Sequence, residues 1–212
     1  MPSSPALFEA AAGLSELARR AHARGWALGT SGNFSAVISD EPLRLAITRT
    51  GVDKRVLGPD HILEIDCSGN VLCGTGRPSA EAAVHLAIVR ARGAKAVAHT
   101  HSLWSTLLSD AYSASGGLAI EGYEMLKGLH DVPTHQHREW LPIIENTQDW
   151  VEETVRLQEM LQAHSAAHGF LIRRHGLYTW GRDLAEAARH LEVLEFLLEA
   201  VGRSQVGLGR EA

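Results

Sequence analysis

Two histidines at the end of a short apolar run have the clearest chemical potential in this chain. Residues 94–102 read AKAVAHTHS, which predicts a buried strand ending in His99 and His101. Because side chains alternate between the two faces of a strand, both imidazoles point the same way and can bind one metal ion. A catalytic zinc site usually has three protein ligands, so the pair predicts a third ligand elsewhere in the chain.

A second apolar run offers that third ligand. Residues 169–176 read GFLIRRHG, so His175 follows a predicted strand and precedes a glycine. A lone histidine is more often a core or surface residue than a ligand. Two strand ends that each deliver histidine at a glycine-bounded turn are a stronger signal. We therefore expect a metal centre formed by His99, His101 and His175, with Zn²⁺ as the ion.

The other potential metal ligands have weaker contexts. His135 and His137 repeat the His-x-His spacing, but they lie in a polar segment without an apolar strand, so we expect a solvated loop and no metal there. Cys67 and Cys73 flank a turn and lack the spacing of a zinc knuckle. Two cysteines in a chain of this length predict reduced thiols.

Three small-residue segments could hold an anion, and we call them together the anion cradle. They are Ser31–Gly32–Asn33, Thr50–Gly51, and Ser79, the predicted N-cap of a helix over 80–92. Glycine turns expose backbone N–H groups, and hydroxyl and amide side chains add further donors. Each segment alone is an ordinary turn, so the prediction depends on the three lying together.

The helix predicted over 80–92 carries two titratable residues. Glu81 lies in its first turn, where a carboxylate complements the helix dipole, or where it could act at the metal centre. Both interpretations stay open for Glu81. His85 lies one turn further along, and we interpret it as a packed core histidine.

Composition limits the class of protein. The chain has 212 residues, 45% of them hydrophobic and 21% charged, which is typical of a globular domain. The net charge of −5 and the lack of a basic cluster argue against a nucleic-acid partner. No apolar run is long enough to span a bilayer, and the first residues lack the features of a signal peptide, so we expect a cytoplasmic protein.

The predicted elements indicate a single α/β domain over 1–212, with 203–212 as a loose tail. Strands occur both as hairpins and between helices, which predicts a mixed sheet covered by helices. We expect helices over 5–24, 80–92, 103–108, 123–128, 148–164 and 183–201, and strands over 34–38, 44–48, 62–66, 71–73, 96–101, 118–120, 141–144, 169–174 and 176–180.

These motifs, in this order, resemble the class II aldolase/adducin family over nearly the whole chain. The resemblance rests on the segments at 30–33, 50–51, 77–81, 99–101 and 173–176. It implies a three-layer α/β/α domain with a central, mainly antiparallel sheet. It also implies one Zn²⁺ per subunit on His99, His101 and His175, a substrate phosphate in the anion cradle, and a homotetramer with sites near its subunit interfaces.

Within that family, residues 124–128 and 141–146 are similar to the branch that acts in methionine salvage. This likeness implies a hydro-lyase that dehydrates 5-methylthioribulose 1-phosphate to 2,3-diketo-5-methylthiopentyl 1-phosphate. It implies Glu124 as the catalytic acid and base. Glu81 matches the position of a metal-ligating or acid–base glutamate in the aldolase branch, so it is a possible second acid–base group or ligand.

Two other functions compete with this one. A sugar-phosphate aldolase or epimerase would use the same zinc ion to stabilise an enediolate and would break or re-form a carbon–carbon bond. A non-catalytic, adducin-like binding module is the second alternative, but such a module has no need of the three histidines. The partner in either enzymatic case is a small sugar phosphate.

Overall fold

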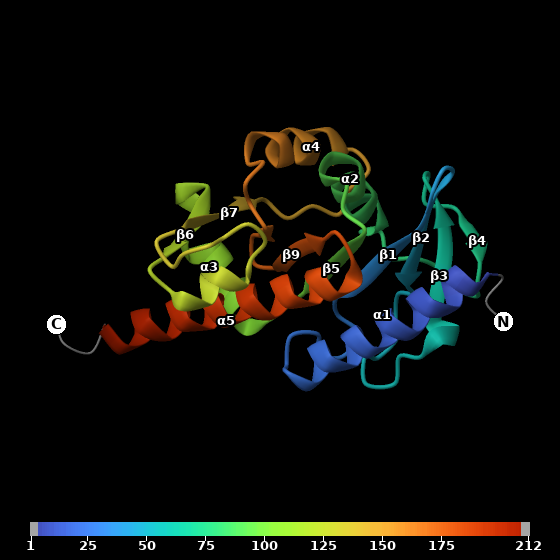
Figure 1. Ribbon diagram of the computed structural model, residues 1–212, viewed down its shortest axis with the longest axis horizontal. Helices are drawn as coiled ribbons and strands as arrows, with labels where there is room; N and C mark the ends of the chain where they lie inside the picture. The colour runs from blue at the N-terminus through green and yellow to red at the C-terminus, as the bar shows by residue number, and fades with distance from the viewer. Residues whose placement is uncertain (1–3, 209–212) are drawn as a thin grey trace.

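The computed structural model describes residues 4–208, and within them nine strands form one sheet with helices on both faces (Figure 1). The strand order is β4-β3-β2-β1-β5-β9-β8-β7-β6, and β7–β8 is the parallel pair. The strands are β1 (Asn33–Asp40), β2 (Leu43–Thr48), β3 (Ile62–Asp66), β4 (Val71–Cys73), β5 (Ala96–Thr100), β6 (Gly117–Glu121), β7 (Arg138–Ile144), β8 (Gly169–Ile172) and β9 (Gly176–Gly181). The mainly antiparallel three-layer α/β/α fold implied by the resemblance is confirmed.

The helices divide into two layers. The helices are α1 (Pro5–Ala23), α2 (Ala82–Arg92), α3 (Leu103–Ala111), α4 (Thr154–Ala163) and α5 (Leu184–Leu208), with short 3₁₀ turns η1 (Pro59–His61), η2 (Ser113–Ser115) and η3 (Glu124–Gly128). Helices α1, α3 and α5 lie on one side of the sheet and α2 and α4 on the other (Figure 1). None of the helices within 4–208 is long and apolar enough to cross a membrane.

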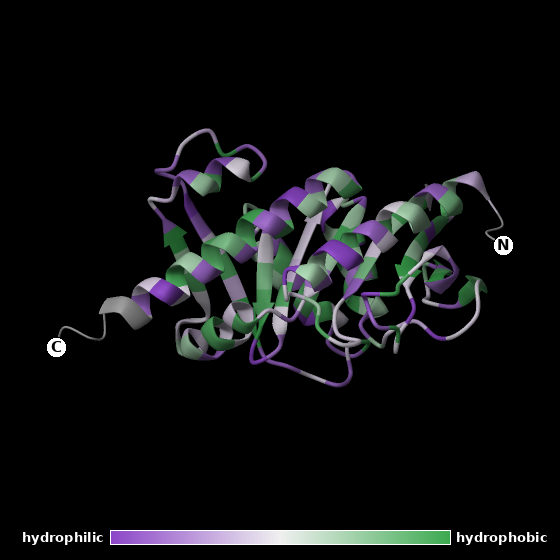
Figure 2. Cartoon of the chain, turned by 90° about the horizontal axis from the view of Figure 1, so that it is seen from below, coloured by the Kyte–Doolittle hydropathy of each residue, from purple (hydrophilic) through white to green (hydrophobic). Residues whose placement is uncertain are grey.

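Side-chain alternation along the strands produces two cores. In β5, Ala98 packs with α1 and α5, whereas Val97 packs with α2 and α4. Coloured by hydropathy, the helices in Figure 2 combine hydrophobic and hydrophilic turns, as expected for amphipathic helices that cover a sheet. The face of β5 that carries Val97 also carries His99, because residues two apart share a face.

Most predicted elements are confirmed, and the differences lie at their ends. Helix α2 begins at Ala82 with Glu81 as its N-cap, so Ser79 as N-cap was wrong. The Ser79 hydroxyl instead accepts a hydrogen bond from the Glu81 N–H at 3.3 Å, which closes a turn ahead of the helix. Helix α4 begins at Thr154 and not at the predicted residue 148, because residues 151–153 form turns.

Helix α5 runs to Leu208, so residues 203–208 of the predicted tail are helical. Gly202 lets the helix continue against α3, since a Cβ at this position would lie 2.0 Å from the Trp104 ring. Residues 209–212 of the predicted tail lie outside the described part of the chain. Cys67 and Cys73 are free thiols, in agreement with the sequence.

A buried carboxyl group joins α5 to the end of β5. Thr100 Oγ1 donates a hydrogen bond to Glu195 Oε1 at 2.5 Å, and Glu195 is only 2% exposed. Burial raises the pKa of Glu195 from 4.5 to about 7, although hydrogen bonds from Ser102 and Thr100 act in the opposite direction. The junction between β5 and the following helix therefore contains a carboxyl group that is neutral in weakly acidic solution.

Replacing Glu195 by glutamine should change how stability depends on pH. Between its unfolded pKa and about 7, the group holds its proton in the folded protein and loses it in the unfolded chain, so the free energy of unfolding falls as pH rises. Glu195→Gln should reduce this pH-dependent decrease in the free energy of unfolding by up to roughly 3 kcal/mol. Urea unfolding at pH 4.5 and pH 8 measures the difference.

The matched control is Glu199→Gln, one turn further along α5. Glu199 is partly exposed and pairs with Arg203 at 2.6 Å. This variant should keep most of the pH dependence of the unmodified chain, because the Glu199 charge is the smallest of the influences on the Glu195 pKa. An unchanged pH slope in Glu195→Gln would show that the buried carboxyl group does not titrate in this window.

Candidate metal centre

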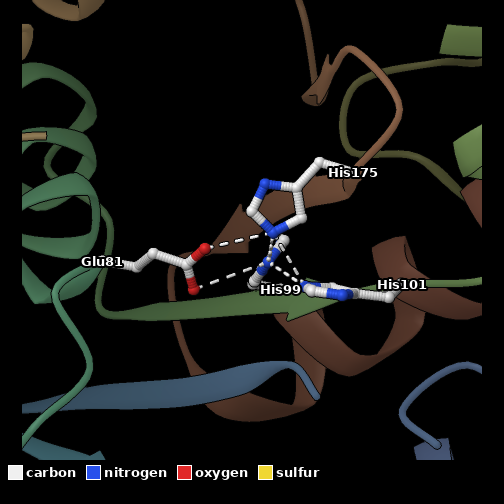
Figure 3. Close-up of side chains that lie close together, drawn as sticks. All are labelled: Glu81, His99, His101 and His175. Carbon is white, nitrogen blue, oxygen red and sulfur yellow. Dashed lines mark hydrogen bonds and ion pairs between the residues drawn. The ribbon is translucent and has the colours of Figure 1, made fainter. Parts of the chain in front are cut away.

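The three histidines predicted as metal ligands converge on one point at the end of β5 (Figure 3). The Nε2 atoms of His99 and His101 lie 2.7 Å apart. His175 Nε2 lies 2.9 Å from His101 Nε2 and 3.3 Å from His99 Nε2. The ligand set predicted from the two strand ends is therefore brought together in space.

Strand pairing explains why His175 reaches β5. Strands β5 and β9 are antiparallel neighbours, with Thr100 opposite Leu177, so the turn before β9 lies at the end of β5. A Cβ on Gly176 would lie 2.0 Å from the Thr100 carbonyl oxygen, so only glycine permits this close approach. Arg174 has φ +55°, which turns the chain between β8 and β9.

Hydrogen bonds on the far side of two rings aim their Nε2 atoms at the centre. The His99 Nδ1–H donates to the Leu177 carbonyl at 2.9 Å, and its ring stacks on Tyr178 with centroids 3.9 Å apart. His175 Nδ1 lies 3.3 Å from Asn146 Oδ1. Metal-bound histidines commonly donate their second ring N–H to such oxygens, because this fixes both tautomer and ring orientation.

The electrostatics of the three rings suit a cation. Burial lowers the pKa of His101 to about 4, with His175 adding to the effect, and burial lowers the pKa of His99 well below its ordinary value. Neutral imidazoles whose lone pairs face each other repel. Nitrogens about 2.0–2.1 Å from one zinc ion in a tetrahedral site lie roughly 3.3 Å apart. The 3.3 Å separation of His99 and His175 matches this value, and the 2.9 and 2.7 Å separations of the other two pairs are shorter.

Glu81 faces the same point from the start of α2 (Figure 3). Its Oε1 lies 3.1 Å from His175 Nε2, and its Oε2 lies 3.7 Å from His99 Nε2. Burial opposes ionisation, but contacts with His175, His99 and Asn33 outweigh it and hold the pKa of this carboxyl well below its usual range. Glu81 is thus an ionised carboxylate positioned to be a fourth ligand or a base.

A buried hydrogen-bond chain holds Glu81 in place. Asn33 Nδ2 donates to Glu81 Oε2 at 2.5 Å, and the Asn33 Oδ1 is bonded in turn by His85 Nε2. The Ser35 hydroxyl contacts His85 Nδ1 at 2.7 Å. The prediction of His85 as a buried core histidine is confirmed, but its polar contacts to β1 residues could not be seen in the sequence.

A cavity of about 240 Å³ lies beside the histidines and contains most of the anion cradle. Its lining includes Ser31, Gly32, Asn33, Thr50, Ser79, Glu81, His101 and His175. Gly51 supplies a turn with φ +75° but is not among the lining residues. Gly32 has φ +73°, and a Cβ there would lie 2.7 Å from the His99 carbonyl oxygen. Glycine at this position therefore lets the cradle pack closely against β5.

A buried lysine behind the anion cradle was missed by the sequence analysis. The Lys54 Nζ donates to the carbonyl oxygens of Thr30 at 3.0 Å and Val52 at 3.2 Å, which ties the two turns together. It is 1% exposed, and burial lowers its pKa to about 8 against the opposing charges of Asp53 and Glu81. Arg49 also lines the cavity. Neither residue has a spacing that singles it out in the sequence.

Glu124 does not meet the histidines within its own chain. It belongs to η3, its side chain is 71% exposed, and it is not among the residues that line the cavity. Its carboxylate lies 2.6 Å from Lys127 Nζ and 3.6 Å from His135 Nδ1. Within one chain, Glu124 therefore lies outside the candidate metal centre.

Comparisons with known proteins agree with this geometry. Residues 12–201 match the model of the Class II Aldolase and Adducin N-terminal domain. A methylthioribulose-1-phosphate dehydratase of Sorangium cellulosum is 42% identical over 191 residues, covering 89% of each chain. The enzyme of the same name from Methylococcus capsulatus is 43% identical over 190 residues, covering 89% of this chain and 91% of the relative.

Solved structures show the same fold. L-fuculose-1-phosphate aldolase from Thermus thermophilus superposes with a TM-score of 0.74 at 24% identity, over 99% of both chains. A sugar-phosphate aldolase from Thermotoga maritima gives 0.70 at 22% identity, over 98% of this chain and 97% of the other. With the family model covering most of its length and its three histidines gathered at the end of β5, the chain belongs to the class II aldolase and adducin family.

Proposed function

We propose that this protein is a zinc-dependent hydro-lyase that converts 5-methylthioribulose 1-phosphate to 2,3-diketo-5-methylthiopentyl 1-phosphate, a step of methionine salvage. The observation that carries the proposal is the convergence of His99, His101 and His175 beside a polar cavity. Relatives at 42–43% identity that bear the name of this dehydratase support the choice of substrate.

The proposed reaction removes water from a ketose phosphate. Zinc held by the three histidines would supply a Lewis acid for the C2 carbonyl, which makes the hydrogen on C3 acidic. The neutral imidazoles themselves add no negative charge to the ion. A carboxylate takes the C3 proton and a carboxylic acid assists departure of the C4 hydroxyl, and the resulting enol then becomes the diketone.

The anion cradle is proposed to bind the substrate phosphate. Its hydroxyl and backbone groups lie on the same cavity as His101 and His175, so a bound phosphate would position the sugar carbons beside the metal centre. Lys54 adds a positive charge behind the cradle. No carboxylate within the described residues forms an ion pair with it, so a substrate anion is a natural counter-charge.

Glu124 is proposed to act from a neighbouring subunit of a homotetramer. Its exposed position on η3 leaves it free to enter a site on an adjacent copy, and a ring of subunits would repeat this contact at every site. Glu81 is the alternative within the chain, and its place among the histidines favours a role as fourth ligand.

The free cysteines fit a cytoplasmic location.

The two competing functions are less well supported. An aldolase or epimerase would use the same centre, and the solved neighbours below 25% identity define the fold without separating these reactions. The relatives named as dehydratases favour loss of water. A non-catalytic binding module would not need three histidines aimed at one point.

Incubation with 5-methylthioribulose 1-phosphate should yield the diketone in the presence of zinc. His175→Ala should hold one zinc ion fewer than the unmodified chain and lose the dehydration, because it removes one of three ligands. Product analysis and metal content measure both effects. Release of dihydroxyacetone phosphate in place of the diketone would instead identify an aldolase.

Ser79→Ala should raise KM about tenfold or more through loss of one hydrogen bond to a charged phosphate, while zinc content stays unchanged. The effect should vanish with 5-methylthioribulose, which lacks the phosphate. Ser68→Ala, on the exposed turn between β3 and β4, is the matched control. An equal loss with both substrates would place Ser79 outside the phosphate site.

Glu124→Gln should lower turnover by roughly 10²-fold or more and leave zinc in place. Equal amounts of Glu124→Gln and His175→Ala subunits can be reassembled into mixed rings. About a quarter of the sites would then take intact histidines from one variant and an intact Glu124 from the other, and these sites would regain activity. Mixing therefore distinguishes a residue acting across an interface from one acting in its own subunit. Failure to regain activity would redirect the assignment to Glu81.

A further inference from the structure

A second group of metal-ligating side chains lies at the opposite edge of the sheet. His137 precedes β7, Glu139 is the second residue of β7, and His168 directly precedes β8. Strands β7 and β8 are parallel neighbours, so their first residues lie at the same edge. The candidate metal centre uses the residues that follow the other ends of these strands.

Both histidine side chains of this group contact the same carboxylate oxygen of Glu139. His137 Nε2 lies 2.8 Å from Glu139 Oε2, and His168 Nδ1 lies 2.9 Å from the same oxygen. Glu139 is only 1% exposed, whereas His137 remains partly accessible. Two imidazole nitrogens and one carboxylate oxygen, all within 4.8 Å of one another, form a ligand set that zinc uses elsewhere.

The remaining polar atoms of His168 and Glu139 are already fixed by the backbone. His168 Nε2 donates to the His130 carbonyl at 2.8 Å, and Glu139 Oε1 accepts from the His168 backbone N–H at 2.8 Å. This arrangement leaves His168 Nδ1 and Glu139 Oε2 directed at each other and at His137 Nε2. Such outer hydrogen bonds orient metal ligands in known sites.

A cavity gives this group access to solvent. It has a volume of about 450 Å³ and is lined by both His137 and His168. His190 also lines it, but both ring nitrogens of His190 are engaged, one with the Trp180 carbonyl at 2.8 Å and one with the His130 N–H at 3.0 Å. Three protein ligands would thus remain, with an open position toward the cavity.

We propose that His137, Glu139 and His168 form a second site for a divalent transition metal, separate from the candidate metal centre. Imidazole and carboxylate donors suit zinc, cobalt and nickel better than calcium or magnesium. An ion bound here would join the starts of β7 and β8 and fix the end of the loop between η3 and β7. The alternative is a His–Glu–His hydrogen-bond network that holds no ion.

Zinc titration of chelator-treated, tag-free protein distinguishes the two. The unmodified chain should bind about two zinc ions, and His137→Ala or His168→Ala should bind about one, because a site left with two ligands loses most of its affinity. His175→Ala should also retain about one, held at the second site. Cobalt absorption spectra of the same variants report the two sites independently of catalysis.

His135→Ala is the matched control, because this neighbouring histidine is exposed and its ring lies beside Glu124. It should keep two zinc ions. His137 is partly exposed, so its replacement tests the site even if His168→Ala fails to fold. A single zinc ion in the unmodified chain that is lost in His175→Ala would overturn the proposal, as would two ions retained in both His137→Ala and His168→Ala.

Discussion

The convergence of three imidazole nitrogens within 3.3 Å is the constraint on which the rest of the site depends. Neutral rings gain nothing from facing each other this closely, so the surrounding structure must hold them. Pairing of β5 with β9 brings the His175 turn to the end of β5. Gly32 and Gly176 let two turns pack closely against carbonyl groups of β5. Strand pairing and the contacts of the ring Nδ1 atoms thus hold the three Nε2 atoms around a point that suits a cation.

The anion cradle shows a related use of buried charge. Lys54 is removed from water without a carboxylate in contact among the described residues, and only two backbone carbonyls solvate its ammonium group. Burying a cation in this way is costly unless the charge has a partner. Its hydrogen bonds to the Thr30 and Val52 carbonyls place positive charge directly behind the cradle turns. A metal ion held by the three histidines would add positive charge on the same cavity, so the ion and Lys54 together would suit a phosphorylated ketone.

The sequence was sufficient for the parts of the site that depend on local pattern. Alternation along β5 and the glycine after His175 predicted that His99, His101 and His175 lie together, because strand ends at one edge of a sheet are neighbours. Contacts between distant segments were not predictable. Lys54, the His85–Asn33–Glu81 chain and the position of Glu124 outside its own cavity depend on tertiary packing. His137 appeared solvated because its partner His168 is 31 residues away in the chain.

Strand direction accounts for the separation of the two histidine groups. Strands β5 and β8 are both antiparallel to β9, and β7 is parallel to β8, so all three run the same way. Their carboxyl ends bring together the candidate metal centre and Asn146, which contacts His175, while the amino ends of β7 and β8 bring together Glu139 and His168. Strand β7 is therefore common to both edges. Because a strand within a sheet is stiff along its length, an ion that fixed Glu139 would also restrain the strand that leads to Asn146, and through it the orientation of one catalytic-site imidazole.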